Sequence, residues 1–305
     1  MAMIVLVPNE SGERALASLS DVRPLRYQPG APLPQGAHRA RVLVPGFLSA
    51  DGIENLLAQL PELELIQLLS AGAELWADQV RSSVRLSTAR GAHGASTAEW
   101  AMAVLLQIYR DLEGFAESRR ERRWDRHRTE TLQGKRVLIV GAGDLGRDLA
   151  RKLRAFDSEV TLVAHSAREG VRSTAELPRL LGEHDATVLM VPLTDATTGM
   201  VDAAFLAAMP DGAVLVNAAR GPVVRTEDLL AELDRGRLRA ALDVTDPEPL
   251  PAGHPLWSVP NLLLTPHVAG ASTDAIPRVQ VIVAGQLARY AAGEPLANVV
   301  GAQGY

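Results

Sequence analysis

The stretch "VLIVGAGDLGRDLARKLRAFDSEVTLVAHSAR", residues 137–168, joins a predicted strand, a glycine-rich turn, a helix and a second strand. Gly141, Gly143 and Gly146 give the spacing G-x-G-x-x-G, and its place between a strand and a helix makes the pattern specific. The first glycine permits a tight turn, the second lets the backbone approach a pyrophosphate, and the third lets helix and strand pack closely. Free N–H groups at the helix start attract phosphate. The stretch therefore predicts a dinucleotide-binding unit.

The end of the second strand differs from that of an NAD-specific unit. An Asp or Glu there would bind the free 2′-hydroxyl of the adenine ribose, but the position falls at Ala164 or His165. Ser166 and Arg168 follow, and a hydroxyl and a guanidinium can bind a 2′-phosphate, with His165 as a further donor or stacking group. We therefore expect the cofactor to be NADP(H). The alternative is that these are loop residues and that NAD(H) is also used.

Composition describes an ordinary globular chain. It has 305 residues, enough for two modest domains, of which 47% are apolar and 22% charged. No apolar run approaches the roughly 20 residues of a membrane span, and "MAMIVLVPNE" reads as a strand rather than a secretory signal. The chain has no cysteine, which excludes disulfides and zinc–thiolate sites. We expect a cytoplasmic protein with no metal site and no membrane partner.

Charge gives little reason to expect nucleic acid as a partner. The net charge is −5, and the one basic segment is "SRRERRWDRHR", residues 118–128, with six arginines. Two acids interrupt that run, and Trp124 is its only aromatic residue. The run is typical of a solvated helix end or an oligomer contact. A nucleic-acid-binding surface is the alternative.

Strand and helix patterns alternate along the chain, which predicts parallel sheets covered on both faces. We expect the fold class α/β with two doubly wound domains, a Rossmann cofactor domain and a flavodoxin-like substrate domain. A long helix is expected over 96–120, with Ser96 or Thr97 and Glu99 forming a capping box. The predicted strands are 3–7, 40–44, 63–69, 136–140, 159–164, 187–191, 213–217, 238–243 and 261–265. The other predicted helices are 12–19, 50–60, 144–156, 174–183, 202–208, 226–235 and 272–295, and 26–38 is a predicted surface loop.

Three segments after predicted strands each offer one polar group beside the expected nicotinamide: Arg220, Glu248 and His267. Reducing a 2-keto acid needs a hydride at carbon and a proton at oxygen. A guanidinium can hold the substrate carboxylate with paired donors and polarise the carbonyl. An imidazole can supply the proton and recharge near neutrality, and a nearby carboxylate would orient the ring and favour its imidazolium form. Taken singly, each residue also reads as an ordinary loop or surface group.

The chain resembles the D-isomer-specific 2-hydroxyacid dehydrogenases, on the segments "LQGKRVLIVGAGDLG", "VLMVPLTDATTGMV", "MPDGAVLVNAARGPVV", "AALDVTDPEPLPAGHPLW" and "NLLLTPHVAG". The resemblance implies Arg220 as the substrate-binding and catalytic arginine, Glu248 as the partner of the acid, and His267 as the acid/base. It implies that backbone N–H groups near Ala71 and Gly72 hold the substrate carboxylate. The cofactor contacts that it adds to those above are Asp144, Leu145, Val191, Pro192, Thr197, Ala218, Ala219 and Asp243.

The same resemblance implies a domain plan and an assembly. Residues 98–271 would form the cofactor domain, and 1–97 with 272–305 the substrate domain. The 96–120 helix and the arm after it would form the contact of a homodimer. His93, in "RGAHGAS", would either touch substrate or make a hydrogen bond in the hinge.

The favoured function is the interconversion of a small 2-keto acid and a D-2-hydroxy acid, with glyoxylate or hydroxypyruvate as substrate. A bulkier substrate such as phenylpyruvate stays open, and phosphite oxidation is a more distant alternative. Formate dehydrogenases resemble the chain as well but carry an amide where Glu248 stands. The alternative outside catalysis is a dinucleotide-sensing co-repressor. Such proteins usually carry extra flexible tails, of which this sequence shows almost none.

Overall fold

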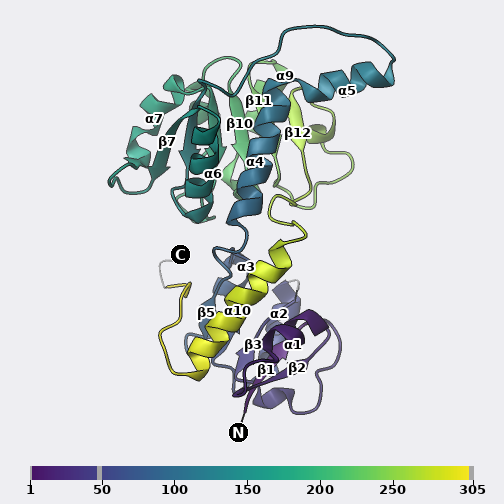
Figure 1. The fold of residues 1–305 in the computed structure, drawn as a ribbon, viewed down its shortest axis with the longest axis vertical. Coiled ribbons are helices and arrows are strands. Elements are labelled where there is room, and N and C mark those ends of the chain that lie inside the picture. The colour runs from purple at the N-terminus through teal and green to yellow at the C-terminus, as the bar shows by residue number, and fades with distance from the viewer. Residues whose placement is uncertain (1, 47–49, 302–305) are drawn as a thin grey trace. The chain divides into compact units, whose positions relative to one another are not determined.

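The computed structural model describes residues 2–46 and 50–301 (Figure 1). The chain divides into two compact units. Unit 1 consists of Met1–His93 and Thr273–Tyr305, and unit 2 of Gly94–Ser272. Each unit is built on its own parallel sheet, so the predicted fold class is confirmed.

Unit 1 contains the sheet β2-β1-β3-β4-β5, whose strand order is that of flavodoxin-like folds. Neighbouring residues of a strand enter two different cores: Leu6, Leu43 and Ile66 belong to one, and Val5, Val42 and Leu65 to the other. This alternation shows that both faces of the sheet are covered. The strands are β1 (Met3–Val7), β2 (Val22–Arg26), β3 (Val42–Leu43), β4 (Leu65–Gln67) and β5 (Arg85–Ser87). The helices are α1 (Glu10–Leu16), α2 (Ala50–Ala58), α3 (Glu74–Ala77) and α10 (Ala275–Ala291).

Unit 2 contains the sheet β12-β11-β10-β9-β6-β7-β8, a Rossmann order extended at one edge. The strand order reverses between β6 and β9, and ligands of such sheets bind at the carboxyl ends of the strands beside that point. The strands are β6 (Arg136–Val140), β7 (Glu159–Ala164), β8 (Arg172–Ser173), β9 (Ala186–Leu189), β10 (Val214–Asn217), β11 (Arg239–Leu242) and β12 (Leu262–Leu264). The helices are α4 (Gly94–Tyr109), α5 (Leu112–Arg120), α6 (Asp144–Ala155), α7 (Leu177–Leu180), α8 (Ala203–Ala207) and α9 (Thr226–Asp234).

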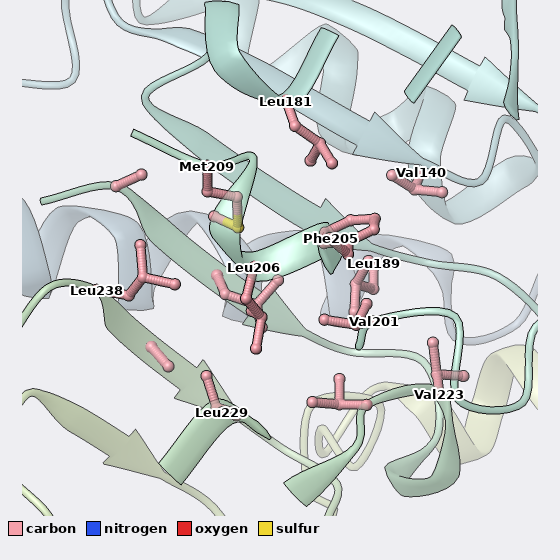
Figure 2. Packing of buried hydrophobic residues seen from close by; sticks show 14 of the residues in the cluster. Val140, Leu181, Leu189, Val201, Phe205, Leu206, Met209, Val223, Leu229 and Leu238 are labelled. Atoms are coloured by element: carbon pink, nitrogen blue, oxygen red, sulfur yellow. The ribbon is translucent and has the colours of Figure 1, made fainter. Parts of the chain in front are cut away.

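Two apolar cores cover this second sheet. On one face, Val140 and Leu189 of the strands pack with Phe205 and Leu206 of α8 (Figure 2). On the other face, Ile139 and its strand neighbours pack with residues of α4 and α6. The sheet is therefore buried on both sides, and only its strand ends and their loops are free to carry a site.

The single helix predicted over 96–120 is wrong. The structure has two helices, α4 and α5, separated at Asp111, whose backbone adopts φ 47°. A left-handed residue cannot continue a right-handed helix, and aspartate tolerates this conformation better than most residues. The Asp111 carboxylate also accepts a hydrogen bond from the His127 ring at 2.9 Å, which ties the break to the return loop.

The predicted capping box is wrong for a related reason. Helix α4 begins at Gly94, so Ser96 and Thr97 lie inside its first turns, where both are buried. Three short strands were not predicted: β2, β5 and β8. The sequence of β2, "VRPLR", contains a proline, which only an edge strand accommodates.

In the part of the chain that the structure describes, none of the helices combines the length and the hydropathy that crossing a membrane requires.

An ion-pair network joins α10 to the sheet of unit 1. The Arg41 guanidinium donates to both carboxylate oxygens of Glu64, at 2.7 and 2.9 Å, and the Tyr290 hydroxyl donates to the same carboxylate. The guanidinium of Arg85 lies 4.8 Å from the centroid of the Tyr290 ring. The hydrogen bonds from Arg41 and Tyr290 lower the pKa of Glu64 to about 2.

This pKa predicts an acid-sensitive contribution to stability. Because the folded-state pKa of Glu64 is depressed, its contribution is present above about pH 4.5 and lost as pH falls toward 2. We expect Glu64→Gln to lower the free energy of unfolding by about 0.5–1 kcal/mol at pH 7, since the half-exposed pair is screened by solvent, and by less at pH 3. Urea denaturation at both pH values measures this, with Glu62→Gln as the exposed neighbouring control. An equal loss at both pH values would contradict the prediction.

Candidate active site

The three glycines of the turn after β6 meet different surroundings. Gly141 has φ 121°, and a Cβ there would lie 2.3 Å from the carbonyl oxygen of Met190. A Cβ on Gly146 would lie 1.9 Å from the carbonyl oxygen of Gly141. A Cβ on Gly143 would have no heavy atom within 4 Å. Packing thus requires glycine at positions 141 and 146. At Gly143 there is instead open space, through which a ligand could approach the backbone.

The open space at Gly143 lies at the start of α6. Gly143 is the N-cap residue and supplies no side-chain hydrogen bond, so the first N–H groups of the helix are not capped by it. Asp144 and Leu145 form the first turn of this helix. Open backbone beside uncapped N–H groups fits a pyrophosphate, and these residues would hold it there.

The three residues predicted to bind a 2′-phosphate lie in the exposed loop after β7. Arg168 donates from Nη2 to the carbonyl oxygen of Ala142 at 3.3 Å, and from Nη1 to that of Ser166 at 3.4 Å. The backbone carbonyl oxygen of His165 accepts a hydrogen bond from the Ser173 hydroxyl at 3.1 Å. Arg168 is therefore held against the glycine turn, at the edge where an adenine ribose would lie.

The other predicted cofactor residues lie at the same edge of the sheet. Val191 and Pro192 follow β9, and Thr197 closes their loop by donating to the carbonyl oxygen of Pro192 at 2.7 Å. Ala218 and Ala219 follow β10. Carboxyl ends of parallel strands share one edge of a sheet, so these loops line the same side as the glycine turn.

Arg220 stands in a turn that Asn217 shapes. The buried Asn217 side chain donates from Nδ2 to the carbonyl oxygen of Arg220 and accepts the N–H of Ala219, both at 3.0 Å. The guanidinium of Arg220 donates to the carbonyl oxygen of Ala219 at 2.7 Å. Sequence reasoning missed the part of Asn217, although a polar residue ending the apolar strand "VLV" was a usable signal.

Glu248 and His267 lie in direct contact. Nδ1 of His267 lies 2.6 Å from Oε1 of Glu248, and both side chains are about half exposed, at 48% and 40%. The carboxylate accepts the Nδ1 proton, which leaves Nε2 as the ring nitrogen open to another partner. This is the geometry of an imidazole oriented by a carboxylate.

The turn that carries His267 depends on Asp243. This carboxylate is buried and accepts hydrogen bonds from the Thr265 hydroxyl at 2.6 Å and from the N–H groups of Val268 and Ala269 at 2.8 Å. His267 itself has φ 54°, an uncommon conformation for a side-chain-bearing residue. The hydrogen bonds of Asp243 therefore stabilise the turn that carries His267. The predicted contact of Asp243 with the cofactor stays a prediction.

The loops of Arg220 and Glu248 touch through their backbones. A Cβ on Gly221 would lie 1.9 Å from the carbonyl oxygen of Thr245, so only glycine fits there. The Thr226 hydroxyl also donates to the carbonyl oxygen of Asp246 at 3.0 Å. The structure thus brings the loops of all three predicted catalytic residues together on neighbouring strands.

Ala71 and Gly72, the predicted carboxylate-binding residues, follow β4 of unit 1. Their loop is fixed by the Ser70 hydroxyl, which donates to the carbonyl oxygen of Gly72 at 2.7 Å. Nε2 of His93 lies 3.0 Å from the carbonyl oxygen of Leu69, in the same loop. Of the two roles expected for His93, the structure supports the hydrogen bond, and substrate binding by Ala71 and Gly72 stays a prediction.

Comparison with known proteins decides the family. Residues 102–269 match the family model described as "D-isomer specific 2-hydroxyacid dehydrogenase, NAD binding domain". The chain belongs to the D-isomer specific 2-hydroxyacid dehydrogenase family. It is therefore an oxidoreductase, and most of unit 2 is the family's NAD-binding domain.

Other members of this dehydrogenase family are similar over nearly the whole chain. Human glyoxylate reductase/hydroxypyruvate reductase is 29% identical, covering 95% of this chain and 94% of that protein. A family member from Aeromonas salmonicida has a solved structure with a TM-score of 0.88 and 29% identity, covering 98% of this chain and 99% of its own. An NADPH-dependent glyoxylate/hydroxypyruvate reductase from Sinorhizobium meliloti, solved with NADP and sulfate, has a TM-score of 0.85 and 29% identity, with full coverage of both chains.

The surroundings of the glycines predict a separation of folding from binding. Gly143→Ala should leave the apo protein as stable as the parent, because its Cβ meets open space, while weakening dinucleotide binding at least about tenfold through a clash with the pyrophosphate. Gly141→Ala should destabilise the apo protein itself, because of its φ and the Met190 carbonyl. Thermal unfolding without cofactor and fluorescence titration with NADPH measure the two effects. Unchanged binding by Gly143→Ala would count against the assigned pyrophosphate site.

Proposed function

We propose that the chain reduces a small 2-keto acid to the D-2-hydroxy acid with NADPH. The observation that carries this proposal is the 2.6 Å contact of His267 Nδ1 with Glu248 Oε1, beside the Arg220 loop and on the same sheet edge as the glycine turn. The bound nicotinamide supplies the hydride. The expected cytoplasmic location stays a prediction.

His267 acts as the proton donor in this proposal. Glu248 accepts the Nδ1 proton, stabilises the charged ring and directs Nε2 toward the substrate oxygen. After Nε2 gives its proton to that oxygen, the ring is neutral and recovers a proton from solvent, to which it is half exposed. The reverse reaction uses the same groups, with neutral His267 accepting the proton of the hydroxyl.

Arg220 binds the acid. Asn217 fixes the backbone of its turn, and the hydrogen bond from Nη1 of Arg220 to the Ala219 carbonyl oxygen orients the guanidinium, which carries several N–H donors. A carboxylate and an adjacent keto oxygen can share those donors, which holds the substrate and draws electron density from the carbonyl carbon. Both effects make that carbon a better hydride acceptor.

Glyoxylate and hydroxypyruvate are the substrates we favour. Two similar proteins, the human and the Sinorhizobium meliloti enzymes, are named as reductases of these acids. NADPH is the cofactor we favour, because the loop after β7 offers Ser166 and Arg168 in place of a carboxylate, and the Sinorhizobium meliloti enzyme is named as NADPH-dependent.

A screen of NADPH oxidation with a panel of 2-keto acids tests this proposal. We expect turnover of glyoxylate or hydroxypyruvate, and a loss of about 10²–10⁴-fold in kcat for His267→Ala, because the proton donor is removed. NADPH binding by that variant, followed by fluorescence, should be unchanged. His38→Ala, at an exposed histidine of unit 1, is the matched control. An enzyme that binds NADPH but turns over no 2-keto acid would instead support a dinucleotide-sensing protein.

We further propose that the chain forms a homodimer through the arm made of α5 and the loop 121–131. The arm leaves the body of unit 2 (Figure 1), and its residues Trp124 and Leu112 are 96% and 53% exposed. Such large apolar side chains on a projecting segment favour a protein contact. The arginine run lies on the same arm, so a partner subunit gives it a structural role.

Trp124→Asp tests the dimer. The substitution should convert a dimer into a monomer, because a carboxylate replaces an apolar contact, while the thermal stability of each unit is kept. Analytical ultracentrifugation measures the mass, and Trp257→Asp serves as a control at a tryptophan that is 56% exposed and lies outside the arm. A monomeric parent protein, or a dimeric Trp124→Asp variant, would refute the assembly.

A further inference from the structure

Two guanidinium groups converge on one carbonyl oxygen of the glycine turn. Ala142, between the first two glycines, accepts from Nε of Arg147 at 3.2 Å and from Nη2 of Arg168 at 3.3 Å. Arg147 comes from the first turns of α6, directly after Gly146, and Arg168 from the loop after β7. The two donor nitrogens therefore lie within two hydrogen-bond lengths of each other.

Neither of these guanidinium groups forms an ion pair over residues 2–46 and 50–301, and there the terminal nitrogens of Arg147 make no hydrogen bond. Two acids lie near Arg147 along α6. Asp148 is already bound by Arg151 and Lys152, and in the described part of the chain Asp144 makes no ion pair with Arg147 or Arg168. Like charges this close repel each other, so their arrangement is favourable when an anion joins them.

We infer that Arg147 and Arg168 together form a clamp for the 2′-phosphate of NADPH, with Arg147 as an unassigned determinant of cofactor choice. This inference rests on the proposed use of NADPH. A phosphate monoester carries up to two charges and three acceptor oxygens, which match two guanidinium groups and the hydroxyl of Ser166. The Ala142 carbonyl fixes one nitrogen of each arginine and leaves the other donors of Arg147 for the anion.

The clamp would determine the preference for NADPH over NADH and would not take part in catalysis. NADH has only a hydroxyl at this position, so it cannot relieve the repulsion between the two arginines. Arg147 should therefore affect binding of the 2′-phosphorylated nucleotide and leave binding of the unphosphorylated one unchanged.

Isothermal titration with 2′,5′-ADP and with 5′-AMP tests the clamp without any turnover. The parent protein should bind 2′,5′-ADP more tightly than 5′-AMP. Arg147→Gln and Arg168→Gln should each weaken 2′,5′-ADP by about tenfold or more, the loss typical of a charge-assisted hydrogen bond. Both variants should leave 5′-AMP unchanged. Arg154→Gln removes the same charge from an exposed position near the end of α6 and should change neither affinity.

Each other outcome has a distinct meaning. If the parent prefers 2′,5′-ADP but Arg147→Gln retains that preference, the role of Arg147 is refuted and the proposed use of NADPH stands. If the parent binds both nucleotides equally, the use of NADPH and the clamp fail together. If Arg154→Gln weakens 2′,5′-ADP as much as Arg147→Gln does, the effect is one of general charge and the clamp is refuted.

Discussion

The in-register pairing of β10, β11 and β12 determines where the three predicted catalytic side chains lie. Asn217 pairs with Leu242, and Leu242 with Leu264, so the three strands end at one level. Arg220 and His267 each follow their strand end by a short turn, and Glu248 follows by a longer loop. The backbone hydrogen bonds of the sheet thus bring three chemically different side chains to one edge, and the buried Asp243 carboxylate holds the His267 turn onto that framework.

Much of this arrangement could be predicted from the sequence. Apolar runs and glycine spacing were sufficient for the fold class, because a sheet buried on both faces needs nearly continuous apolar strands. Arg220, Glu248 and His267 could be singled out because each is a polar residue in a segment that follows such a strand. Asn217 and Gly221 were missed as shaping residues, because their importance lies in backbone contacts across different loops, which no local pattern reveals.

The errors share a physical origin in short or irregular backbone. The break at Asp111 depends on a left-handed backbone conformation and on His127, sixteen positions later. The helical periodicity of the sequence continues across Asp111, so it did not predict the break. The strands β2, β5 and β8 contain few residues and lie at sheet edges, where burial no longer imposes an apolar pattern. Arg147 was not predicted as a site residue because it is an ordinary exposed residue of a helix. Only the folded turn shows that its guanidinium and that of Arg168 donate to the same carbonyl oxygen.

The backbone contact between Gly221 and Thr245 has a consequence for how such an enzyme can diverge. Because the Thr245 carbonyl oxygen lies against Gly221, neither loop can shift at that point without moving the other. An insertion at the contact itself would break it, whatever chemistry the site performs. Changes of specificity that keep the contact are therefore exchanges of side chains, or changes in segments away from it.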